Sequence, residues 1–144
     1  MEDIIIDNLK KKLTPIFLRD KRIAAVYLFG SYSQGAVREG SDIDLAVLLS
    51  PPKSFSLDDT LDLEVKITLS LKTEKFDLVL ANTASLILQF RVISTGKLIY
   101  VDDDNLRSDF EERVMQEYYD FLPRLNEFNR EYFAALKRRG LKNA

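Results

Sequence analysis

The sequence predicts an α/β (α+β) fold in which helices flank a small mixed sheet and a long helix forms the C-terminal end. Short apolar runs at 23–28 and 76–80 are typical of buried strands, and apolar residues recur at helical spacing from 106 onward. The 144 residues, 46% of them hydrophobic and 31% charged, have the size and composition of one globular domain. We therefore expect one domain over 1–144, with 104–139 as its C-terminal helical segment.

The first predicted element is an amphipathic helix over residues 3–13, because Ile6, Leu9 and Leu13 recur at helical spacing. Pro15 is expected to interrupt this helix, since proline lacks an amide hydrogen and its ring clashes with the preceding turn. The helix is therefore expected to end there, or to restart as a short turn with Pro15 at its first position.

Two predicted strands enclose a segment rich in glycine and serine. The run at 23–28 predicts a buried strand, and residues 30–41 are expected to form a loop or a short helix. Residues 42–49 begin polar and become continuously apolar, which predicts a strand at the centre of the sheet.

Residues 61–71 fit two patterns. Apolar residues alternate strictly with polar ones, which favours a half-buried strand. Every fourth residue from Leu57 to Leu69 is also apolar, and Ser56 followed closely by two aspartates is a typical helix start. The residues alone leave helix and strand open here.

The following segment predicts a helix and a short strand. Asn82 or Thr83 is expected to cap a helix over 84–94, and Gly96 is expected to stop it. Residues 98–101 then predict a short strand.

The last segment keeps one apolar stripe on both sides of Pro123, so we expect one kinked helix rather than two. Its aromatic side chains have two interpretations, core packing or a surface that binds a partner. We expect core packing for most of them. They are Phe110, Tyr118, Phe121, Phe128, Tyr132 and Phe133.

Composition excludes several kinds of chemistry. The chain has no Cys and no His, so it can form no disulfide, no thiolate or histidine metal site and no histidine-activated nucleophile. A net charge of −2 argues against a chain that coats nucleic acid, and the longest apolar run is too short to cross a bilayer. With an acidic N-terminus as well, we expect a cytoplasmic protein that acts through carboxylates, hydroxyls, amines, backbone amides or a bound ion.

Candidate site residues come from three predicted strands. Gly30 and Ser31 follow a buried strand, where a small residue and the amides after it can cradle a phosphate. Asp42 and Asp44 lie two residues apart at a strand start, so their carboxylates share one face and suit a divalent cation such as Mg²⁺. Asp77 adds a third carboxylate in apolar surroundings.

Each of these features also has a plainer explanation. A Gly-Ser pair after a strand can be a turn, and aspartates at strand ends can simply be solvated. The combination of a phosphate cradle with paired carboxylates favours a site for a metal–nucleotide complex.

These residues resemble a known family. The segments 28–31 (LFGS) and 42–45 (DIDL), ten residues apart, resemble the signature of the nucleotidyltransferase superfamily related to DNA polymerase beta. The segments 76–82 and 96–100 are similar to minimal nucleotidyltransferases, and over roughly residues 20–120 the chain resembles the MntA-type antitoxins of HEPN–MNT toxin–antitoxin pairs. The resemblance implies a polymerase-beta-like nucleotidyltransferase fold, with a helix at 58–71.

The resemblance also implies roles for the site residues. Asp42 and Asp44 would bind Mg²⁺, two ions in all. Asp77 would complete the metal site and help to deprotonate the acceptor hydroxyl. Gly30 and Ser31 would hold the triphosphate of ATP, the implied substrate.

The implied partner is a HEPN-domain toxin, a small ribonuclease with a tyrosine whose hydroxyl receives AMP from ATP. Gln34 stands where the family often has arginine, so one charge contact to the triphosphate would fall to Arg38 or another basic residue.

Two other functions stay open from the sequence. One is a small-molecule nucleotidyltransferase resembling aminoglycoside-modifying enzymes, and the other is a non-catalytic antitoxin that neutralises its partner by binding. Neither direct nucleic-acid binding nor membrane attachment is expected, and the sequence leaves room for a homo-oligomer.

Overall fold

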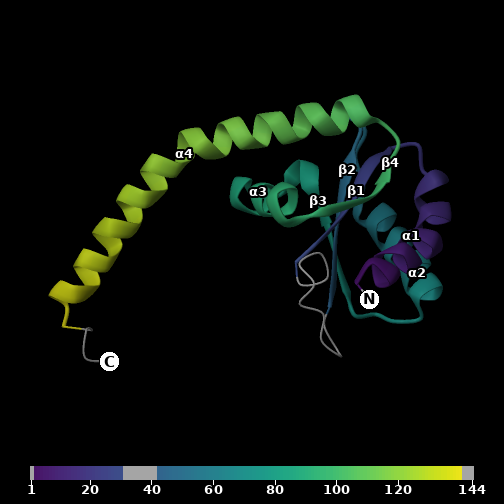
Figure 1. Ribbon diagram of the computed structural model, residues 1–144, viewed down its shortest axis with the longest axis horizontal. Helices are drawn as coiled ribbons and strands as arrows, with labels where there is room; N and C mark the ends of the chain where they lie inside the picture. Colours follow the sequence, from purple (N-terminus) through teal and green to yellow (C-terminus); the bar gives the residue numbers. More distant parts are fainter. Residues whose placement is uncertain (1, 31–41, 141–144) are drawn as a thin grey trace.

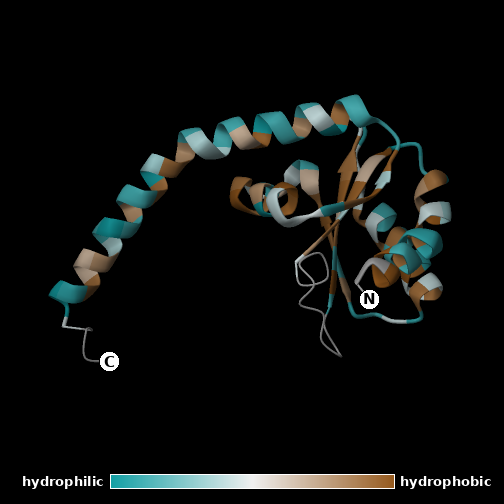
Figure 2. Cartoon of the chain, viewed as in Figure 1, coloured by the Kyte–Doolittle hydropathy of each residue, from teal (hydrophilic) through white to brown (hydrophobic). Residues whose placement is uncertain are grey.

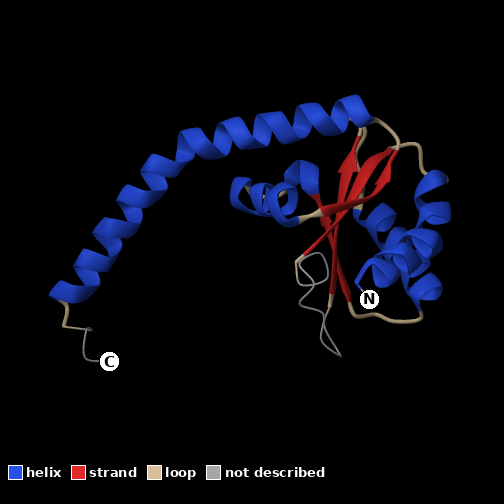
Figure 3. Ribbon diagram, in the orientation of Figure 1, coloured by secondary structure: helices blue, strands red, loops and turns tan. Residues whose placement is uncertain are grey.

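The computed structural model describes residues 2–30 and 42–140 and contains one four-stranded mixed sheet with helices on both faces (Figures 1 and 3). The strands lie in the order β3-β2-β1-β4, and β2 is parallel to β3 while β1 is antiparallel to both of its neighbours. The predicted fold class and the central position of the second strand are therefore confirmed. The strands are β1 (Ile23–Phe29), β2 (Ile43–Leu49), β3 (Phe76–Leu80) and β4 (Lys97–Val101).

The side chains of β2 alternate between two hydrophobic clusters, one on each face of the sheet. Leu45 and Val47 pack on the face covered by helices α1 (Glu2–Leu18) and α2 (Leu57–Leu71). Ala46 and Leu48 pack on the face covered by α3 (Leu86–Thr95) and α4 (Asp104–Arg138). Figure 2 shows the strands as a largely brown, apolar layer between the helices. Both faces of β2 are buried, which explains why its sequence is continuously apolar after Asp44.

Helix α1 (Glu2–Leu18) continues through Pro15, so the predicted interruption is wrong. Leu13 and Phe17, on either side of the proline, are both fully buried in the core. Their burial holds the last turn in helical form despite the amide hydrogen that Pro15 lacks.

Helix α2 (Leu57–Leu71) resolves the ambiguous segment in favour of the helix that the family resemblance implies. Ser56 and Asp59 form a capping box: the Ser56 hydroxyl accepts from the Asp59 amide, and the Asp59 carboxylate accepts from the Ser56 amide. Only Leu63 and Ile67 of this helix are buried, four residues apart, so the strict alternation does not reflect burial on a sheet.

Helix α3 (Leu86–Thr95) begins later than predicted, because Ser85 rather than Asn82 or Thr83 caps it. The side-chain amide of Asn82 instead accepts from the Leu49 amide (2.8 Å) and donates to the Leu49 carbonyl (2.9 Å). These two bonds fasten the 3₁₀ turn η1 (Ala81–Thr83) to the end of β2. Gly96 ends α3 as expected.

Helix α4 (Asp104–Arg138) is one helix through Pro123, as predicted, and it bends along its length in Figure 1. Phe110 and Val114 bury its first half against the sheet, and Tyr118 stacks on Phe90 of α3 with ring centroids 3.7 Å apart. No helix in the part of the chain that the structure describes is long and apolar enough to cross a membrane.

The aromatic stripe of α4 only partly packs in the core. Phe110 is buried and Tyr118 is half-buried, but Phe128, Tyr132 and Phe133 are more than half exposed. Core packing was expected for most of the stripe, and that expectation is wrong for these three residues because the second half of α4 extends away from the sheet (Figure 1).

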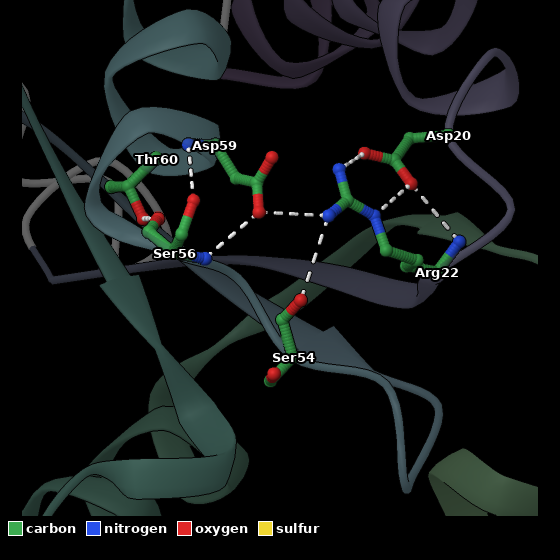
Figure 4. A network of polar contacts seen from close by, with 6 residues as sticks. All are labelled: Asp20, Arg22, Ser54, Ser56, Asp59 and Thr60. Carbon is green, nitrogen blue, oxygen red and sulfur yellow. Dashed lines mark hydrogen bonds and ion pairs between the residues drawn. The ribbon is translucent and has the colours of Figure 1, made fainter.

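An arginine connects the start of β1 to the start of α2 (Figure 4). The Arg22 guanidinium binds the Asp20 carboxylate through Nε (2.9 Å) and Nη2 (2.8 Å), and its Nη1 lies 2.9 Å from Asp59. Its cation also lies 4.4 Å from the ring centroid of Phe55. Arg22 therefore holds together the two segments that lead into β1 and α2.

Candidate active site

The site lies where β1 ends and where β2 and β3 begin, and three carboxylates come from neighbouring backbone positions there. Asp44 of β2 and Asp77 of β3 are register partners in the parallel pair, so their side chains leave the same face of the sheet. Asp42 directly precedes β2 and is exposed, as is Asp77. The face is the one that also carries Ala46 and Leu48 and is covered by α3.

Gly30 ends β1 beside Asp44. The strand register pairs Phe29 with Asp44, and Gly30 follows with a φ of 76°. A Cβ on this residue would overlap Oδ2 of Asp44 and lie 3.2 Å from its Cγ. Only glycine therefore allows both the left-handed backbone and the close approach of the carboxylate.

Asp44 has a pKa raised above its ordinary value of 3.8, chiefly because the carboxyl is partly buried and also because Asp77 and Asp42 are negatively charged. The positive charge of Arg91 acts in the opposite direction. Part of this shift is therefore repulsion from the two neighbouring aspartates. A bound cation would relieve it.

Sequence reasoning missed Arg91, which lies on α3 and is exposed. Within the described residues Arg91 forms no ion pair, although its charge acts on Asp44. Its place in the sequence, inside an apolar helix 47 residues after Asp44, gives no motif that would identify it. Only the packing of α3 over the Asp44 face brings the two together.

The described residues do not form a complete metal-binding site by themselves. No group of three or more aspartates or glutamates in ranges 2–30 and 42–140 is close enough together to hold an ion. The donor chemistry nevertheless suits Mg²⁺, which commonly binds one or two carboxylates and completes its shell with substrate phosphates and water. Ser31, Gln34 and Arg38 lie outside the described residues.

A hollow of about 520 Å³ opens between α2 and the edge strand β3 and reaches Asp77. Its apolar wall includes Leu61, Val65 and Leu69 of α2, which belong to a row that is exposed to solvent. Glu64 and Glu74 also line the hollow and make it acidic. The hollow therefore lies on the α2 side of β3, has apolar and acidic surfaces, and meets the site at Asp77.

Comparison with known proteins identifies relatives of this chain. Over 99 residues it is 38% identical to the protein adenylyltransferase MntA of Shewanella oneidensis. The match covers 62% of this chain and 65% of the relative, so it spans just under two thirds of that protein.

Solved structures share the fold over most of the chain. A chain from a toxin–antitoxin structure with AMP-PNP superposes with a TM-score of 0.72 at 27% identity, covering 86% of this chain and 98% of the other. A structure of the tri-AMPylated Shewanella oneidensis HEPN toxin in complex with MNT antitoxin gives a TM-score of 0.66 at 22% identity, covering 92% and 99%, which shows the common fold.

The sequence model of the family described as polymerase beta, nucleotidyltransferase matches residues 11–105. This range begins within α1 and ends just after β4, so it contains the whole sheet, Gly30 and all three aspartates. The chain belongs to the polymerase beta nucleotidyltransferase family.

Proposed function

We propose that this protein is a protein adenylyltransferase antitoxin, which transfers AMP from ATP to a tyrosine hydroxyl of a HEPN-domain toxin and thereby neutralises it. The observation that carries the proposal is the juxtaposition of Asp44 with Asp77 in register and Gly30 beside them. The 38% identity to the adenylyltransferase MntA and the likeness to a toxin–antitoxin structure with AMP-PNP support the same reaction and partner.

In this proposal, residues at the end of β1 and on α3 bind the nucleotide. Gly30, with its positive φ and no side chain, allows a triphosphate to approach the backbone, and the Ser31 hydroxyl and the amides after it supply donors. Arg91 supplies a positive charge on the same face. It is our candidate for the phosphate contact that Gln34 cannot make.

Each Mg²⁺ would be held by one or two of the carboxylates of Asp42, Asp44 and Asp77, and the phosphates of ATP would complete its shell. When bound, the ion neutralises negative charge on the phosphates and on the carboxylates. Partial burial raises the pKa of Asp44, and the charges of Asp77 and Asp42 add to this effect. A cation beside the carboxylates would offset the repulsion between them.

The reaction requires one bond to form and one to break. The acceptor hydroxyl oxygen attacks the α-phosphorus of ATP, the bond from this phosphorus to the oxygen that bridges to the β-phosphate breaks, and pyrophosphate leaves. Asp77 accepts the hydroxyl proton and passes it to solvent, to which it is exposed. The protein contributes mainly position and charge, so the absence of histidine and cysteine is no obstacle.

The acceptor is expected to approach through the hollow beside Asp77. Leu61, Val65 and Leu69 offer it an apolar surface, and Glu64 and Glu74 favour an acceptor segment with basic residues. This side of the site is separate from the Gly30 side, so acceptor and nucleotide can be bound at once.

A turnover experiment tests the function. One part of this protein is incubated with a tenfold molar excess of the purified toxin, ATP and Mg²⁺, and toxin mass and ribonuclease activity are measured. We expect every toxin molecule to gain AMP and to stay inactive after the protein is removed. An antitoxin that only masks its partner would need equimolar amounts, would ignore ATP and would release active toxin.

Two variants separate catalysis from toxin binding in the same experiment. Asp77→Asn should still bind the toxin but fail to modify it, because the proposed base is missing. Val65→Lys should lower adenylylation through a higher KM for the toxin while leaving the KM for ATP unchanged. Protection by the Asp77→Asn variant at the tenfold excess would rule out the catalytic proposal.

A further inference from the structure

The second half of α4 carries aromatic side chains with nothing in the described chain to cover them. Phe128 is 63% exposed and Tyr132 52% exposed, whereas Phe110 and Val114 in the first half are buried. Figure 1 shows this half, shaded green to yellow, projecting away from the sheet and its helices. In proteins most of the stability of a helix comes from packing of its apolar face against other elements rather than from helix propensity. We call residues 121–138 of α4 the arm, and its uncovered aromatic face calls for a partner surface.

The spacing of the arm's apolar residues is that of a two-helix coiled coil. Phe121, Leu125, Phe128 and Tyr132 follow one another at intervals of four, three and four residues. In a heptad they occupy alternating d and a positions, which line a single seam. Pro123 falls at position f, on the opposite side of the helix, so the bend that it favours leaves the seam continuous.

We propose that two copies of this protein pair through an antiparallel contact between the second halves of their α4 helices. The two-fold axis passes between residues 126 and 127. Leu125 then meets Phe128 of the second copy, and Phe121 meets Tyr132 of the second copy. These contacts, repeated by symmetry, form four apolar layers.

Charge complementarity selects a second copy in antiparallel orientation. Arg124 and Glu131 both occupy position g beside the seam, are exposed, and form no ion pair with a described residue. They are seven residues apart, so they cannot pair within one helix. In the antiparallel arrangement each Arg124 faces Glu131 of the other copy. A parallel pair would instead place Arg124 against Asn129 and Glu131 against Leu136, and neither of these residues is charged.

Sedimentation equilibrium of the full chain, followed as a function of protein concentration and salt, tests the pairing. We expect a monomer–dimer equilibrium. Arg124→Glu and Glu131→Arg should each weaken the dimer at least tenfold, because each variant places like charges opposite one another. An equimolar mixture of the two variants should restore dimers, since each R124E arm then faces an E131R arm with opposite charges at both positions. No restoration in the mixture would overturn the antiparallel register.

Two equally exposed phenylalanines on the arm, one in the seam and one outside it, allow a controlled test of the seam. Phe128 and Phe133 are 63% and 62% exposed, but only Phe128 lies in the seam. Phe128→Ser should abolish the dimer, whereas Phe133→Ser should leave the dissociation constant within about twofold. Circular dichroism checks that both variants keep the same fold.

Pairing of the two arms is independent of the proposed adenylyl transfer, so a loss of dimers and a loss of AMP transfer are separate results. A chain that remains monomeric at all concentrations, or equal effects of Phe128→Ser and Phe133→Ser on dimerisation, would refute the pairing. If the toxin covered the arm instead, Phe128→Ser would weaken toxin binding while the free protein sedimented as a monomer, and this result would also refute it.

Discussion

The carboxylate of Asp44 occupies the space that a side chain on Gly30 would need. The left-handed backbone of Gly30 places its α-carbon so near the Asp44 carboxylate that a Cβ would overlap Oδ2. The same residue that turns the chain out of β1 therefore sets how close the backbone and the carboxylate lie. In the proposed site, a nucleotide held at the end of β1 would thereby be positioned relative to Asp44.

Replacing Gly30 by alanine should disturb both features at once. A residue with a Cβ at this φ costs about 1–2 kcal/mol, and Asp44 must move to avoid the overlap. We expect AMP transfer to fall about 100-fold or more, with a modest loss of thermal stability. Gly140→Ala is the control, because Gly140 also has a positive φ (74°) but a Cβ there meets nothing within 4 Å. Equal activity of the Gly30→Ala variant and the wild type would contradict the proposed site.

Asp44→Asn should stabilise the protein in a pH-dependent way when no metal is present. The folded-state pKa of Asp44 is raised, so the stability linked to its protonated form is present below 3.8 and lost as pH rises through the folded pKa. The variant should therefore become more stable relative to the wild type as pH rises above 3.8. Urea denaturation in a chelator between pH 3.5 and 7 measures this difference.

In the same experiment, Asp20→Asn should change stability with pH in the opposite direction to Asp44→Asn. Hydrogen bonds from Arg22 lower the pKa of Asp20, so its contribution is present above 3.8 and lost as pH falls through the folded pKa. This variant should be less stable than the wild type near neutral pH and should approach it in acid. A gain in stability at neutral pH would show that Asp20 and Arg22 are not coupled in this way.

The sheet and the long helix could be predicted from the sequence because their signals are local. Continuous apolar runs identify β1 and β2, which are buried on both faces, and the stripe through Pro123 identifies α4. The patterns failed where tertiary contacts decide the outcome. Burial of Leu13 and Phe17 keeps α1 helical beyond Pro15. Asn82 hydrogen-bonds to Leu49 of β2 instead of capping α3.

The aspartates of the site were found from the sequence because a short strand fixes their spacing. Asp42 and Asp44 share a face by alternation, and Asp77 stands out as a third carboxylate in an otherwise apolar strand. The family resemblance then implied its role. Arg91 could not be found in this way. Its relation to Asp44 depends on how α3 packs across the sheet, which no short-range pattern records.

Arg22→Met should weaken the junction between β1 and α2 without affecting catalysis. The variant keeps most of the side-chain length but loses the bonds to Asp20 and Asp59. We expect only a small loss of stability near neutral pH, because these exposed ion pairs are screened by solvent. Thermal denaturation in low and high salt measures the loss, which should shrink in high salt. A change in KM for ATP would contradict the purely structural role.

Arg91→Gln should affect the nucleotide and Asp44 together. If Arg91 binds the triphosphate, its removal takes away a charge-assisted bond, and the KM for ATP should rise about tenfold, which corresponds to about 1.4 kcal/mol. Arg91 also opposes the rise in the pKa of Asp44, so the acidic limb of the pH–rate profile should move to higher pH in the variant. Arg91→Lys keeps the charge and should preserve most of both properties. A raised KM with an unmoved acidic limb would mean that Arg91 binds phosphate without influencing Asp44. If neither property changed, the arginine would have no part in the site, and the charge contact that Gln34 cannot provide would have to come from another basic residue.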